Sequence, residues 1–108
     1  MGGYEVKFYQ EEGGGCPFVE WLEGLRDREA RARIKVRLDR LERGNFGDSK
    51  SVGEGVFEMR ISHGPGYRIY FGRAGNEVFV ILCGGSKKGQ EGDIREAREC
   101  WRRYKEVK

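Results

Sequence analysis

The sequence has few of the residues that build metal sites and disulfide frameworks. It contains one histidine, His63, and three cysteines, Cys16, Cys83 and Cys100, with no CxxC spacing. An odd number of widely separated cysteines argues against a disulfide framework. A zinc site built from the cysteines and His63 would need scattered ligands, whereas zinc ligands usually come in closely spaced pairs. We therefore expect buried, reduced thiols and no metal.

Long apolar runs are also missing. No stretch approaches the roughly 20 apolar residues that span a bilayer. The first residues, MGGYEVKFYQ, lack the charged-then-apolar order of a signal peptide. Myristoylation of Gly2 is excluded, because Val6 stands where that motif requires Ser or Thr. We expect a cytoplasmic protein without membrane contacts.

Charge is abundant but nearly balanced. The chain has 21 Lys+Arg and 18 Asp+Glu, for a net charge of +3. Arginine outnumbers lysine, and its planar guanidinium can grip a phosphate in two places. This balance is compatible with a nucleic-acid partner and does not establish one. With 108 residues and 12% aromatics, we expect one folded domain over residues 1–108, with its core at about 4–104.

Hydrophobic periodicity predicts elements in the order β-α-α-β-β-β-α. Asp27 suits the N-cap of the longer helix, and Gly44 suits its end. Residues 49–55 are expected to form a short extended stretch and a loop. The expected fold is α+β, with a small, mostly antiparallel sheet, two N-terminal helices and one C-terminal helix. The predicted strands are residues 4–9, 56–61, 67–71 and 78–83, and the predicted helices start at Pro17 and span residues 27–43 and 93–106.

Two alternating runs joined by the turn SHGPG predict an antiparallel hairpin. If Ile61 pairs with Tyr67, every apolar residue of one strand meets an apolar residue of the other, which is how register is usually fixed. The same register places Arg60 opposite Arg68. Like charges in that position destabilise a strand pair by up to about 1 kcal/mol.

A bound phosphodiester would relieve this repulsion, because two guanidinium groups can grip it together. Alternatively, Glu58, which the same register places opposite Tyr70, screens both arginines on an exposed sheet face. The basic loop of residues 84–89 ends the central strand and could project Lys87 and Lys88 onto the same cleft. It lacks the spacing of a Walker phosphate loop.

Residues 55–61 (GVFEMRI), 64–71 (GPGYRIYF) and 84–90 (GGSKKGQ), followed by Asp93 and Ile94, resemble the RelE/ParE toxin superfamily. The branch with the greatest resemblance is the HigB-like, phage-type "addiction module killer protein" group. Residues 18–22 (FVEWL) and 41–48 (LERGNFGD) also match that group. The resemblance extends over about residues 4–104, in the same order.

This resemblance implies the toxin of a type II toxin–antitoxin module. Such toxins are ribosome-dependent, metal-independent mRNA endonucleases that need no cofactor. The ribose 2′-OH attacks the adjacent phosphate and leaves a 2′,3′-cyclic phosphate and a 5′-OH. The implied partners are mRNA on the ribosome and a cognate antitoxin, expected to be a small helix-turn-helix protein. A homodimer or a hetero-oligomer with the antitoxin is the expected assembly.

The resemblance also assigns residue roles. Arg68 would stabilise charge developing on the phosphate, and Arg60 would bind and orient the backbone. Glu58 falls where some relatives carry a carboxylate base and others a lysine, and Lys87 falls near a basic residue that assists the leaving group. Further substrate contacts are expected from Tyr70, Lys88, Gln90 and His63.

This chain departs from the branch at two places. Ser86 stands where the branch often has Asp, and Gln90 and Asp93 occupy the region of a late Tyr or His acid. Two other functions fit the same fold. One is a ParE-like inhibitor of DNA gyrase, and the other is a catalytically inactive remnant that only binds RNA or an antitoxin.

Overall fold

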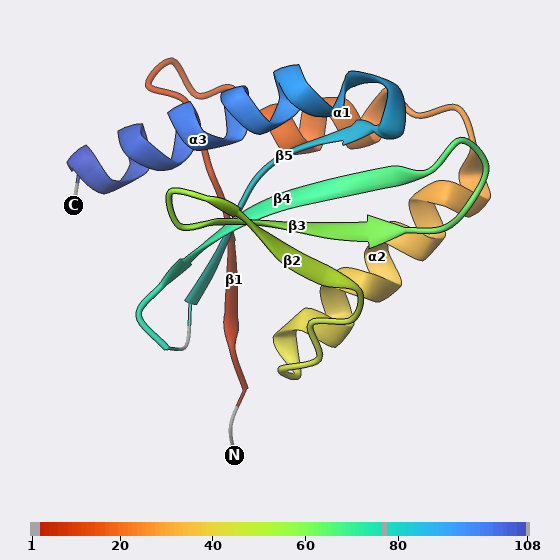
Figure 1. Cartoon of the computed structure of the whole chain (residues 1–108), viewed down its shortest axis with the longest axis horizontal. Helices are drawn as coiled ribbons and strands as arrows, with labels where there is room; N and C mark the ends of the chain where they lie inside the picture. Colours follow the sequence, from red (N-terminus) through yellow and green to blue (C-terminus); the bar gives the residue numbers. More distant parts are fainter. Residues whose placement is uncertain (1–2, 77, 108) are drawn as a thin grey trace.

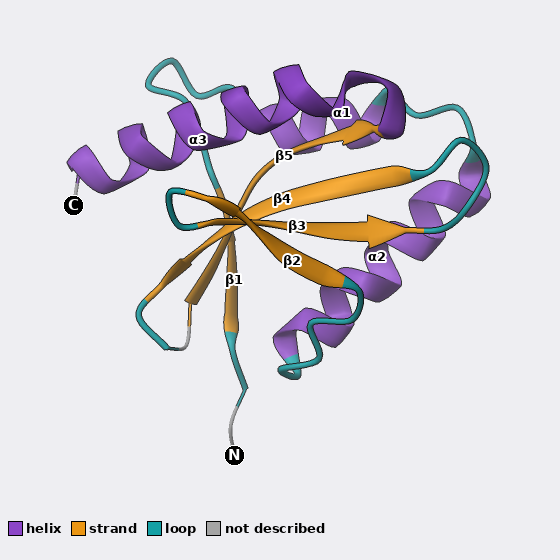
Figure 2. Cartoon of the chain, viewed as in Figure 1, coloured by secondary structure: helices purple, strands orange, loops and turns teal. Residues whose placement is uncertain are grey.

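The sheet order explains how distant segments meet. The structure is a computed structural model that describes residues 3–76 and 78–107. Its strands lie in the order β1-β5-β4-β3-β2, with β1 parallel to β5 and the other neighbours antiparallel. Figures 1 and 2 show this twisted sheet with helices on both sides, which confirms the predicted α+β class. The elements are β1 (Glu5–Phe8), α1 (Pro17–Glu23), α2 (Arg28–Glu42), β2 (Ser49–Gly53), β3 (Val56–Ile61), β4 (Tyr67–Ala74), β5 (Val78–Ser86), a 3₁₀ turn (Lys87–Gly89) and α3 (Gln90–Val107).

Local sequence sets the ends of the first two helices. Pro17 opens α1, where its missing N–H costs no hydrogen bond. The Asp27 carboxylate accepts hydrogen bonds from the backbone N–H groups of Glu29 and Ala30 at 3.0 and 3.1 Å. Gly44 has a φ of +84°, the left-handed conformation that commonly ends a helix. Both predicted caps of α2 are confirmed.

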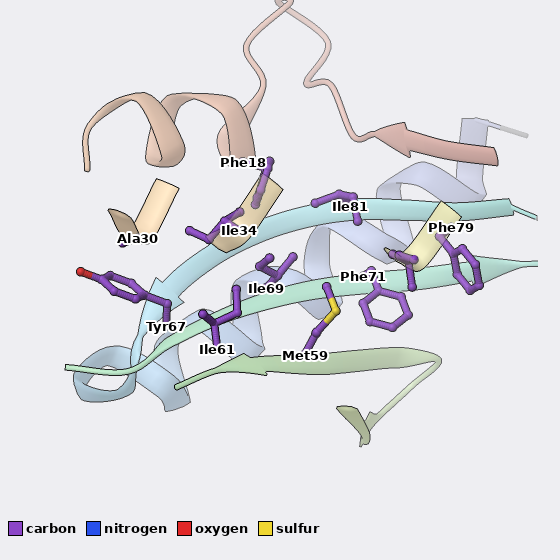
Figure 3. Close-up of a cluster of buried hydrophobic side chains, with 11 residues drawn as sticks. Phe18, Ala30, Ile34, Met59, Ile61, Tyr67, Ile69, Phe71, Phe79 and Ile81 are labelled. Carbon is purple, nitrogen blue, oxygen red and sulfur yellow. The ribbon is translucent and has the colours of Figure 1, made fainter. Parts of the chain in front are cut away.

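Two hydrophobic cores lie on opposite faces of the sheet. The first lies between the sheet and helices α1 and α2 (Figure 3), and includes Phe18, Ile34, Met59, Ile69 and Phe79. The second lies between the sheet and α3. Its buried members are Tyr9, Val56, Tyr70, Val80, Leu82, Cys83, Ala97, Cys100 and Trp101. Strand β5 contributes to both cores, as its continuous apolar run predicted.

The β3–β4 hairpin has the predicted register. Ile61 pairs with Tyr67, Arg60 with Arg68, and Glu58 with Tyr70. The sheet also has an edge strand, β2, where the sequence predicted only an extended stretch. It pairs with β3 from Ser49 opposite Met59 onward.

Helix α3 covers part of the hairpin face that the sequence predicted to be open. It begins at Gln90, earlier than predicted, and the Trp101 ring packs directly on Gly72 of β4. Glu58 and Tyr70 are therefore fully buried. No helix in the described part of the chain is both long and apolar enough to cross a membrane.

Candidate functional site

A polar groove of about 520 Å³ lies along the turn between β3 and β4. Three cationic residues line it: Arg60 from β3, Arg68 from β4 and Lys87 from the 3₁₀ turn after β5. Asp48 is the one acidic residue among the described residues of its lining. The groove is therefore positively charged, which suits an anionic ligand.

A single buried carboxylate lies between the two facing arginines. Nε of Arg60 lies 3.3 Å from Oε1 of Glu58, and Nε of Arg68 lies 3.3 Å from Oε2. The Arg60 contact is a hydrogen bond, whereas the Arg68 contact is an ion pair in which Nε–H makes no hydrogen bond to a described residue. The side chain of Arg68 is 11% exposed and that of Arg60 is 40% exposed. Glu58 thus offsets the repulsion that the register creates.

The terminal nitrogens of both guanidinium groups remain available. Among the described residues, none accepts a hydrogen bond from Nη1 or Nη2 of Arg60 or Arg68. Both residues line the groove. The paired arginines therefore offer two forks of N–H donors, a geometry suited to phosphate oxygens.

Glu58 is held by four side chains and is 0% exposed. Besides the two arginines, the Gln90 amide donates to Oε2 at 2.7 Å and the Tyr70 hydroxyl donates to it at 3.3 Å. Burial raises the pKa of Glu58, but these hydrogen bonds and the positive charge of Arg68 together outweigh burial and hold the pKa below its usual value. The carboxylate is thus ionised at neutral pH and has no open path to the groove.

The remaining predicted site residues lie in different places. His63 lines the groove, but its Nε2 lies 3.0 Å from Oδ2 of Asp27 at the start of α2. Lys87 is exposed in the groove, whereas Lys88 is exposed outside the groove lining. Tyr70 and Gln90 contact Glu58 behind the arginines instead of the groove.

Three contacts fix the groove to the rest of the fold. The His63–Asp27 pair ties the hairpin turn to α2, and Arg37 of α2 donates a hydrogen bond to the Arg60 carbonyl at 2.6 Å. The backbone N–H of Lys87 donates to the Gly66 carbonyl at 3.1 Å. The turn is therefore anchored to both α2 and the end of β5.

Sequence reasoning missed several residues at this site. Asp48 and Tyr67 line the groove, and although both lie in segments that resemble the toxin superfamily, neither was predicted to be a site residue. The side chain of Asp93 lies against Gly85, the sheet partner of Arg68, and burial raises its pKa above the usual value. Lys50 lies opposite Glu58 in the β2–β3 register, so it shares the sheet face of the arginines. Lys50 could have been placed beside the arginines only by predicting that β2 pairs with β3, and the sequence predicted β2 only as an extended stretch.

The structure also places the three cysteines. Cys83 and Cys100 are buried, and all three are free thiols. Burial raises the pKa of both, in Cys100 to about 11, so these thiols are unreactive at neutral pH. Within residues 3–76 and 78–107, no group of three or more His, Cys, Asp or Glu side chains lies close enough to hold a metal ion.

Comparison with known protein families identifies the family of this chain. Residues 20–105 match the model of the phage-derived Gp49-like protein family (DUF891). A protein of Haemophilus influenzae described as uncharacterized is 46% identical over 81 residues, which is 75% of this chain and 82% of that protein. The chain belongs to the Gp49-like family, a RelE/HigB-like family of toxins of the toxin–antitoxin type.

Proposed function

We propose that this protein is a HigB-like toxin of a type II toxin–antitoxin module, and that it cleaves mRNA on the ribosome without a metal. One observation carries the proposal. Arg60 and Arg68 lie directly opposite each other, and their terminal nitrogens have no described hydrogen-bond acceptors in a positively charged groove. Glu58 occupies the Nε side of each guanidinium group, and a phosphodiester could bind to the terminal nitrogens of both.

In the proposed reaction, the ribose 2′-OH gives its proton to water as its oxygen attacks the adjacent phosphorus, and the 5′-oxygen of the next nucleotide leaves and takes up a proton to become a 5′-OH. Arg68 stabilises the charge that develops on the phosphate oxygens. Arg60 holds the backbone so that the 2′-OH is in line with the leaving oxygen. Lys87 lies in the same groove, where its ammonium can neutralise the leaving oxygen.

The geometry favours a positioning role for Glu58 over a role as base. A base must approach the proton that it removes, and Glu58 is fully buried with both oxygens in use. In this position it fixes the directions of the two guanidinium groups. Glu58→Gln should therefore lower the cleavage rate at every pH, whereas loss of a base would also remove the acidic limb of the pH–rate profile.

The decisive experiment is induced expression of the wild-type chain and of Arg68→Ala in growing bacteria. Primer extension on cellular mRNA should reveal cleavage within translated regions by the wild type and none by the variant. Arg33→Ala is the matched control, because Arg33 is an exposed arginine of α2 whose Nη2 pairs with Glu29 at 2.8 Å. Circular dichroism of the purified variants checks that they are folded.

Other outcomes identify the other functions. Growth arrest with inhibited supercoiling, a DNA-damage response and intact mRNA would establish a gyrase inhibitor instead. Absence of both activities, with salt-dependent RNA binding, would establish an inactive RNA-binding relative. Full toxicity of Arg68→Ala would refute the proposed role of the arginine pair. The expected antitoxin is a small helix-turn-helix protein, and its co-expression should abolish the wild-type effect.

A further inference from the structure

A second hollow, of about 280 Å³, lies beside the edge strand β2. Its walls include four phenylalanines, Phe46, Phe57, Phe71 and Phe79, and two cationic residues, Lys50 and Arg73. The mRNA-cleavage mechanism proposed above uses none of them.

Phe46 and Phe57 are partly exposed in the hollow beside positive charge, whereas Phe71 and Phe79 are 3% and 0% exposed and belong to the first core. The Phe57 and Phe71 rings stack with centroids 5.6 Å apart. The Arg73 guanidinium lies over the rings of Phe46 and Phe79, 5.4 and 5.6 Å from their centroids. Proteins that bind single-stranded nucleic acid use this combination, because bases stack on aromatic rings while cations contact phosphates.

The first residues of β2 separate this hollow from the cationic groove. Asp48 lines the groove, and its neighbour Ser49 lines the hollow. The Asp48 carbonyl accepts a hydrogen bond from the Arg60 N–H at 2.8 Å. A strand of RNA leaving Arg60 therefore has only the edge of β2 to cross before it reaches the phenylalanines.

Lys50 lies on the edge strand between the two places, on the sheet face of the arginines and opposite to the face of Phe57. It is opposite Glu58 in the register, and so diagonal to Arg60 on the same sheet face. Diagonal positions on neighbouring strands are about 7–8 Å apart, within reach of long side chains. Lys50 is exposed and forms no ion pair with any residue that the structure describes. Its ammonium group is available for the next phosphate of the strand.

We propose that this hollow is a nucleotide subsite for RNA, with Lys50 binding the phosphate and the phenylalanine-lined pocket holding a base. The proposal rests on the proposed function, because it adds a position flanking the phosphate at Arg60 and Arg68. The subsite would give the protein a hold on the RNA beyond the scissile bond. The residues of the subsite favour a ligand that combines a flat ring with an anionic group.

The test measures binding of a fluorescein-labelled 2′-O-methyl oligoribonucleotide of about 12 nucleotides, which lacks the attacking hydroxyl, by fluorescence anisotropy over a salt series. Lys50→Ala should weaken binding about fivefold and reduce the slope of log K against log salt by about 0.7, the value for one lost phosphate contact on a single strand. Lys35→Ala is the matched control, since Lys35 is an exposed lysine of α2 that lines neither hollow.

A second variant, Phe46→Leu, tests the base pocket and keeps an apolar side chain in the core. It should weaken binding about fivefold, as expected for one lost stacking interaction, without changing the salt slope. A series of probes, each abasic at a different nucleotide, locates the position that the pocket binds. With the probe that is abasic at that position, the loss of affinity caused by Phe46→Leu should be smaller. Thermal unfolding of each variant checks that the protein is folded.

Equal RNA affinities for Lys50→Ala and Lys35→Ala, or for Phe46→Leu and wild type, would overturn the subsite. If these variants instead lose only the antitoxin, the hollow is a protein-docking site and the proposal is wrong. A different result would refute the proposed function itself. That result is full toxicity of Arg68→Ala, and it does not depend on the RNA affinity of Lys50→Ala.

Discussion

Replacing Glu58 by glutamine should destabilise the fold as well as the site. The substitution keeps the shape of the side chain and removes the charge between Arg60 and Arg68. Arg68, with an 11% exposed side chain, is then a nearly buried cation without an anion, and breaking such a pair costs about 3–5 kcal/mol. The side chain of Arg60 is 40% exposed. Solvent screening therefore limits the stability lost at the Arg60–Glu58 contact to below about 1 kcal/mol. We expect a loss of about 3 kcal/mol, against a total of about 5–15 kcal/mol for a domain.

Urea denaturation at pH 7, followed by circular dichroism, measures this loss. The control is the double variant Glu58→Gln/Arg68→Gln, which removes both members of the buried pair. It should recover part of the stability, with a coupling energy of at least about 1 kcal/mol in the double-mutant cycle. A free energy of unfolding within about 0.5 kcal/mol of wild type for Glu58→Gln alone would refute the view that Glu58 holds the arginines.

Two further predictions concern acid stability and the α3 core. The folded-state pKa of Glu58 is lowered. Its ionised form therefore contributes to the free energy of unfolding above the ordinary carboxyl pKa, and this contribution is lost as the pH falls below about 4.5. A urea series from pH 7 to pH 3 should therefore show a shallower decline for Glu58→Gln than for wild type, and parallel curves would contradict this. Gly72→Ala should destabilise by about 1–3 kcal/mol through overpacking, because a Cβ there would clash with the Trp101 ring. A thermal melt checks this, and an unchanged Tm would show that the ring moves away without cost.

The hairpin register could be predicted because each apolar residue has one apolar partner, and a one-residue slip would expose all of them. The edge strand was harder, since Ser49–Gly53 reads SKSVG, a polar segment that carries no alternating apolar signal. Strand β3 begins after only two intervening residues, so the pairing is local, but a polar strand with no alternating pattern gives no sign of it.

The burial of Glu58 could not be predicted from its own strand. A carboxylate in an alternating strand normally faces water, and it is tolerated inside only when it is paired. Its partners come from β3, β4 and α3. The pattern of α3 predicted an apolar face, but not the face of the sheet on which it packs. The candidate role of Glu58 therefore changed once the helix was placed.

The anchoring of the turn between β3 and β4 has a thermodynamic consequence. The turn is fixed by His63 to α2 and by the Lys87 backbone to Gly66. Because Glu58 already holds both guanidinium groups, binding of a polyanion then orders mainly the long side chain of Lys87, at about 0.5–1.5 kcal/mol. The entropy loss should therefore be small, and calorimetry of RNA binding should show no heat-capacity change of the size that accompanies the folding of a segment.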